Sequence, residues 1–193
     1  MRFKTIAFTS ATMLALAACG HKETTSDTTN TAVVTTVDNA TATDASMIAA
    51  APATGQGFAN AAAASDAFEI ATSKLALTAS RSAAIKRFAQ KMIDAHTGST
   101  AKLKTAAASA SPPITPDPTL SPDQQQKLDG LKAVTGSDFD KAYVNAQVAG
   151  HQAALDALNA YSATGDVAPL KTFATGLIPT VTAHLNMAKG LKP

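Results

Sequence analysis

Apolar residues recur every three or four positions along four long segments, and this spacing predicts four amphipathic helices. The first segment runs from about Phe58 to Ala79, and the second from about Ser82 to Ser109. The third segment follows Gly136, and the fourth follows Gly165. The predicted apolar face of the first helix comprises Phe58, Ala62, Ser65, Phe68 or Glu69, Thr72, and Leu75 or Ala76.

Polar residues and prolines mark the expected helix ends. Ser121, followed by proline, is typical of a cap and a first helical position, and predicts a short extra helix through about Val134. Ser137 or Asp138 is expected to cap the third long helix, and Asp166 the fourth.

Proline within the fourth segment predicts a bend. Pro179 should kink the helix and leave the carbonyl near Thr175 without its usual donor. No segment alternates between apolar and polar residues for long, so we expect no sheet. We therefore predict an all-α four-helix bundle with the short helix in the long second connection, so that the helices pair as two hairpins.

The first 18 residues have the plan of a secretory signal peptide. Arg2 and Lys4 precede an apolar run from about Ile6 to Ala18, which is shorter than the ~20 residues of a membrane-spanning helix. Cys19 follows small residues directly and resembles the lipidated cysteine of bacterial lipoproteins. We therefore predict lipidation at Cys19.

The segment from 19 to 56 is rich in threonine, alanine, serine and aspartate and has few large apolar residues. Such a composition does not bury enough surface to offset its conformational entropy, so we predict a disordered tether. The remaining residues, 57–193, have the length of one domain. That domain contains no cysteine and therefore no disulfide.

Charge narrows the classes of partner. Without residues 1–18 the chain carries 14 basic and 14 acidic residues. It therefore lacks the basic surplus that drives nucleic-acid binding, and we expect membrane contact through the lipid anchor alone. Gly20, not aspartate, follows the cysteine, and by resemblance to enterobacterial sorting this predicts the outer membrane, facing the periplasm, within the bacterial cell envelope.

Each long helix carries one titratable residue on its apolar face: Glu69, His96, His151 and His184. At 1.5 Å per residue, helical counting lets these four meet near the middle of a bundle, with His184 the poorest match. Imidazoles with a carboxylate suit Zn, Cu or Fe, and the neighbouring thioethers Met92 and Met187 suit copper. The alternative is that each histidine pairs with a nearby polar group and the methionines fill gaps, the usual role of such residues.

Motifs for other chemistry are missing from the sequence, including the G-x-S-x-G, H-E-x-x-H and Walker motifs. A di-iron site of the ferritin type needs a glutamate three residues before a histidine, whereas this chain has Ile93, Val148 and Val181 there. The sequence thus predicts no catalytic residues.

Five stretches together resemble the bacterial domain-of-unknown-function family 4142: Ala64–Ile70, Phe88–Thr97, Gly136–Val144, His151–Gln152 and Pro179–Leu185. The resemblance implies a ferritin-like bundle in an exported protein. Family members usually carry aspartate directly before the histidines of the second and third helices, where this chain has Ala95 and Gly150, with Asp94 displaced by one. If those aspartates orient the imidazoles, their loss weakens a metal role.

Two functions therefore remain open. The one favoured by the sequence is a non-enzymatic envelope lipoprotein that binds an envelope protein or a small ligand. The alternative is a metal-binding (Zn, Cu or Fe) or redox protein that uses Glu69, His96, His151 and His184. The sequence predicts no cofactor beyond such a metal.

Overall fold

The computed structural model describes residues 54–193, and these fold into helices without any strand. The helices are α1 (Gly55–Ala79), α2 (Ala83–Ala108), α3 (Pro122–Lys132), α4 (Gly136–Thr164) and α5 (Ala168–Gly190). The predicted all-α bundle with a short extra helix is confirmed. Within the described residues, no helix combines the length and the hydropathy needed to cross a bilayer.

Serine and threonine hydroxyls cap the first three helices. Thr54 Oγ1 accepts a hydrogen bond from the Gly57 amide, so α1 begins three residues before the predicted start. Ser82 caps α2. Ser121 caps α3 and precedes a first-turn proline, as predicted, and it also forms a reciprocal capping box with Gln124.

The predicted caps of α4 and α5 were wrong. Thr135 precedes α4 and Val167 precedes α5, and neither makes a side-chain cap hydrogen bond. Gly136 opens α4 at a φ of +61°, a conformation that favours glycine. Asp166 instead accepts a 2.9 Å hydrogen bond from the Tyr161 hydroxyl, so its carboxylate serves the α4–α5 turn.

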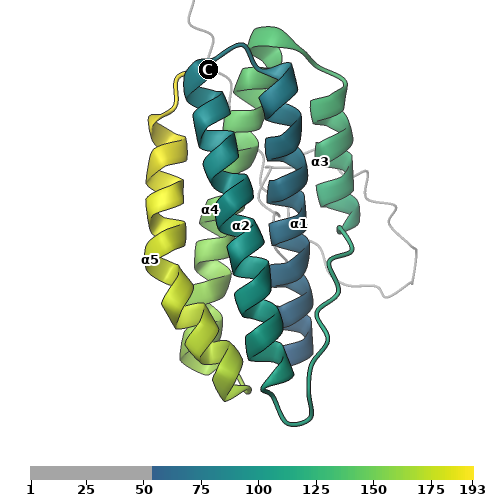
Figure 1. Cartoon of the computed structure of the whole chain (residues 1–193), viewed down its shortest axis with the longest axis vertical. Helices are drawn as coiled ribbons and strands as arrows, with labels where there is room; N and C mark the ends of the chain where they lie inside the picture. Colours follow the sequence, from purple (N-terminus) through teal and green to yellow (C-terminus); the bar gives the residue numbers. More distant parts are fainter. Residues whose placement is uncertain (1–53) are drawn as a thin grey trace, which may run out of the picture. The chain divides into compact units, whose positions relative to one another are not determined.

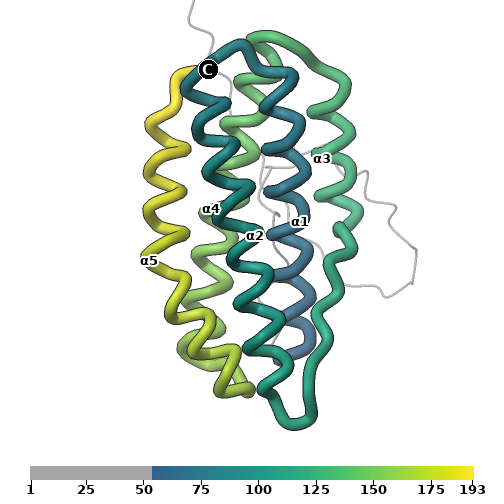
Figure 2. Tube along the Cα trace, viewed as in Figure 1, coloured from purple at the N-terminus to yellow at the C-terminus, as the bar shows by residue number. Residues whose placement is uncertain are grey.

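Two helical hairpins make up the bundle. α1 packs most extensively on α2, and α4 on α5, while α1 also contacts α4 and α2 also contacts α5 (Figure 1). The connection from α2 to α3 runs back along the outside of the bundle (Figure 2). Gln56 and Asn60 of α1 hold it through hydrogen bonds with Thr115 and Asp117. α3 then packs against α1 and α4.

Helix α5 continues through Pro179 and changes direction part-way along its length (Figure 1). The bend matches the kink predicted for a proline inside a helix. Thr175, whose carbonyl lies four residues before the proline, is exposed to solvent.

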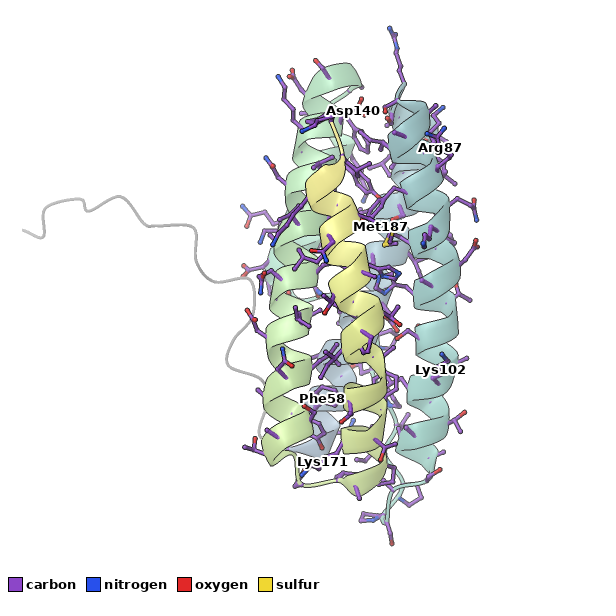
Figure 3. All side chains as sticks on the ribbon, turned by 90° about the vertical axis from the view of Figure 1, so that its left-hand side faces the viewer. Phe58, Arg87, Lys102, Asp140, Lys171 and Met187 are labelled. Carbon is purple, nitrogen blue, oxygen red and sulfur yellow. The ribbon has the colours of Figure 1, made fainter. Side chains whose placement is uncertain are left out.

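Two apolar clusters fill the bundle core, one towards each end (Figure 3 labels Phe58 near one end and Asp140 near the other). The Phe58 cluster contains Phe58, Leu103, Leu158, Tyr161, Leu170 and Phe173 among others. The Phe139 cluster contains Ile85, Phe88, Met92, Leu131, Phe139 and Tyr143 among others. On each long helix, buried polar residues separate the two clusters.

The predicted face of α1 was wrong by one position along part of its length. Ala59, Ala63 and Asp66 are buried there, whereas Ala62 and Ser65 are only half-buried. Alanine and small polar residues surround these positions, so the sequence offers little contrast between a core side and a solvent side.

Candidate metal centre

A buried polar layer separates the two apolar clusters. We define it as Asp66, Glu69 and Thr72 of α1, His96 of α2, Gln147 and His151 of α4, and His184 of α5. Since each of the four long helices contributes to it, the layer crosses the whole bundle.

Three histidines meet inside the polar layer. His96, His151 and His184 each offer one ring nitrogen, and these three atoms all lie within 4.8 Å of one another. The ring centroids are 5.5, 5.6 and 5.9 Å apart, so the imidazoles form a nearly equilateral triangle. The structure thus brings His184 level with the other two, although helical counting made it the poorest match.

His96 is oriented by a carboxylate from α1. Its Nδ1 lies 2.8 Å from Asp66 Oδ1, and Asp66 Oδ2 accepts a hydrogen bond from Thr100. Burial by itself lowers the pKa of His96, but the hydrogen bond with Asp66 and the charges of Glu69 and Asp66 outweigh burial and raise this pKa. His96 Nε2 is buried without a hydrogen-bond partner.

His151 and His184 are held as neutral imidazoles. Nδ1–H of His151 donates to the Gln147 carbonyl at 2.8 Å, which leaves Nε2 buried and unpartnered. His184 Nδ1 is also buried without a partner. Burial, with a contribution from the charge of His96, lowers the pKa of each to about 4. Near neutral pH both rings therefore keep a lone pair for a ligand.

Glu69 lies beside His151, not within the histidine triangle. Its Oε1 is 3.9 Å from His151 Nδ1, and its Oε2 is buried without a partner. Burial raises the pKa of Glu69 to about 7, although the charge of His96 opposes this rise. Since His151 is neutral near pH 7, the contact with Glu69 is not an ion pair there.

The two methionines lie in different environments. Met92 is fully buried in the Phe139 cluster, one helical turn before His96. Met187 is half-buried, and its sulfur accepts a 3.5 Å hydrogen bond from Lys91 Nζ. The Met187 thioether therefore contacts a lysine, a partner that the sequence prediction did not include.

Comparison with known families matches residues 38–191 to a domain of unknown function, DUF4142. The chain belongs to this family. Comparisons with curated proteins and with solved structures gave no significant match. The family resemblance seen in the sequence is therefore confirmed, and it carries no assigned activity.

In this DUF4142 chain, Asp66 supplies a carboxylate partner for His96, which the preceding residue, Ala95, does not have. Asp94 is exposed and bonded to Gln90, so it does not serve His96. Sequence reasoning missed Asp66, although its position three residues before Glu69 puts both side chains on one face of α1. His96 therefore has a carboxylate partner although no aspartate directly precedes it, since the partner comes from a different helix.

Gln147 is the second polar residue that the sequence did not single out as a site residue. Its side chain is fully buried, and Nε2 donates a 3.4 Å hydrogen bond to Thr72. Its Oε1 has no partner. Gln147 stands one turn before His151, so its backbone carbonyl fixes the His151 ring while its amide remains in the polar layer.

The arrangement can hold a metal ion. Three imidazole nitrogens from three helices are the ligand set of open zinc sites, and imidazole also suits copper and iron. Each buried, unpartnered polar atom costs about 1–3 kcal/mol. Coordination would satisfy one such nitrogen on each of the three histidines.

Proposed function

We propose that this protein binds a transition-metal ion through His96, His151 and His184. The observation that carries the proposal is the convergence of three buried imidazoles within 4.8 Å, each with an unpartnered ring nitrogen. A purely structural role accounts for the pairing of His96 with Asp66 and of His151 with Gln147. A structural role does not explain why one nitrogen of each ring is buried without a hydrogen-bond partner.

The two low pKa values support the same proposal. A metal displaces protons from its ligands, so histidines that are already neutral at pH 7 bind an ion without that competition. His151 and His184 meet this condition because burial lowers the pKa of both to about 4.

Metal titration of the full chain, purified without a histidine tag, tests the proposal. We expect Zn²⁺, Cu²⁺ or Fe²⁺ to bind with one-to-one stoichiometry and to raise the melting temperature. A ligand that binds only the folded state stabilises it by RT ln(1 + [L]/Kd), about 2.7 kcal/mol at 100 times Kd. His96→Ala, His151→Ala and His184→Ala should each abolish most of this increase.

Tyr143→Phe is the matched control. It removes a buried hydrogen bond with Ser73 at 2.9 Å but leaves the three imidazoles in place. This variant should lose some stability and keep the metal effect. Absence of stoichiometric binding to the wild-type protein, or retention of binding in all three alanine variants, would rule out the site.

We further propose that the metal-binding domain is tethered by lipid to the cell envelope, at the outer membrane facing the periplasm. The signal peptide, Cys19 and the tether lie largely outside the described residues, and support comes from their sequence pattern. Cys19→Ser should abolish fatty-acid labelling and leave the precursor uncleaved at this position. Normal labelling of that variant would contradict the proposal.

Two finer predictions stand beside these proposals. The ferritin-like topology implied by the family resemblance stays a prediction. The binding of an envelope protein or a small ligand as a partner also stays a prediction.

A further inference from the structure

The first of two acidic residues behind the histidine triangle is Asp66. It is 5% exposed, and its Oδ1 contacts Nδ1 of His96 at 2.8 Å, on the other side of the ring from the unpartnered Nε2. Thr100 donates to its other oxygen at 3.0 Å, so both carboxylate oxygens have a partner. These contacts place a negative charge directly behind one candidate ligand.

The second acidic residue is Glu69, which is 2% exposed. Its Oε1 lies 3.9 Å from Nδ1 of His151, and its Oε2 has no hydrogen-bond partner. On the facing helix, a Cβ added to Gly150 would lie only 2.8 Å from Glu69 Oε1. The missing side chain at position 150 therefore makes room for this carboxylate inside the bundle.

Neither carboxylate has a conventional counter-charge. Within residues 54–193, no lysine or arginine forms an ion pair with Asp66 or Glu69, and their only basic neighbours are histidines. The one lysine–carboxylate pair in that range joins the exposed side chains of Lys132 and Asp129 on α3. Buried charges in proteins are normally paired or lie next to a metal, and here the imidazoles themselves are the only basic groups of the described residues in contact with the two carboxylates.

We infer that Asp66 and Glu69 make the three-histidine site selective for a divalent cation. An imidazole that binds a metal is neutral, so in the metal-bound site the two ionised carboxylates balance a doubly charged ion such as Zn²⁺ or Cu²⁺. A singly charged ion such as Cu⁺ balances only one of the two carboxylates, and the other then has no counter-charge unless it takes up a proton. This inference rests on the proposed function, because it concerns the ion held by the same three histidines.

Neutral, nearly isosteric substitutions test the inference. Dissociation constants for Zn²⁺ and for Cu⁺ under reducing conditions are measured by competition with colorimetric chelators in wild type, Glu69→Gln and Asp66→Asn. Each substitution should weaken Zn²⁺ binding about 10- to 100-fold, the usual cost of losing a group behind a metal ligand. The loss for Cu⁺ should be much smaller, so the preference for the divalent ion falls.

Asp94→Asn is the matched control, because it removes a carboxylate from an exposed position of α2, two residues before His96. Its Zn²⁺ affinity should equal that of wild type. Circular dichroism confirms that each variant is folded, and the two substitutions on different residues provide independent tests.

The outcomes separate this inference from the proposed function. Equal losses for Zn²⁺ and Cu⁺ would mean that the carboxylates act only by holding the histidines, and unchanged Zn²⁺ affinity would mean that they do not act at all. Either result overturns the inference while the metal site stands. If wild type binds neither ion, the proposed function itself fails.

Discussion

The Phe58 cluster and the polar layer are neighbouring parts of one core, yet they differ in how fully their polar groups are satisfied. In the Phe58 cluster, Phe58 stacks on Tyr161 with 3.9 Å between ring centroids, and the Tyr161 hydroxyl donates to Asp166. Of the six buried side-chain atoms without a partner in residues 54–193, five belong to the polar layer. The sixth belongs to Asp140.

This difference separates what folding needs from what binding needs. Burial of apolar surface accounts for the Phe58 cluster without any ligand. The polar layer instead lowers the stability of the bundle, because each unpartnered buried atom has lost its water without gaining a protein partner. Under our proposal, metal binding restores that loss.

The largest expected effect comes from breaking the apolar region. Phe58→Ala removes a 2% exposed ring that also packs edge-on against Phe173. We expect the free energy of unfolding to fall by about 3–5 kcal/mol, measured by urea denaturation, because a cavity remains. The metal affinity of the folded variant should not change, since the cluster is separate from the histidines. A loss of metal binding without unfolding would show that the two regions are coupled.

A smaller effect of opposite sign is expected in the polar layer. His184→Leu replaces an imidazole that carries an unpartnered buried nitrogen by an apolar side chain of similar size. The metal-free protein should gain about 1 kcal/mol of unfolding free energy, because the desolvation cost of that nitrogen is removed. The stabilisation by metal should disappear. A less stable metal-free variant would contradict the difference between the two regions.

A third effect is the dependence of metal-free stability on pH, which the polar layer should produce. His151 and His184 have a folded-state pKa of about 4, against about 6.5 in the unfolded chain. The unfolded state therefore binds more protons between these values, and stability should fall as the pH drops through that window. Glu69 acts in the opposite direction. Burial raises its pKa to about 7, so in the same window the folded state keeps a proton that the unfolded state releases above about pH 4.5, and acidification favours the folded state.

Two histidines outnumber one glutamate, so between pH 6.5 and 4.5 the unfolded state binds about one proton more than the folded state. Acidification through this range should therefore lower the unfolding free energy of the metal-free protein with the slope that one proton gives. Urea denaturation at several pH values measures this slope. His184→Leu removes one of the two histidines and should flatten it, whereas Phe58→Ala should shift the whole curve downwards without changing its slope. A rise in stability on acidification would disprove the assignment of neutral histidines.

The sequence by itself determined the helices, because the signals that specify them are local. Apolar spacing located all four long helices, and Ser121 with its following proline located the short one. The same spacing placed His96, His151 and His184 on buried faces, since a helix fixes which side chains share a face. It failed where local contrast is weak, as in the alanine-rich first half of α1.

Only the tertiary structure decided which polar groups meet. Asp66 and His96 are 30 residues apart on different helices, so their hydrogen bond depends on how α1 and α2 are rotated and shifted against each other. The convergence of His184 with His96 and His151 depends in the same way on the position of α5. Helical periodicity contains no information about the shift of one helix along another, because that shift is set by packing over the whole interface.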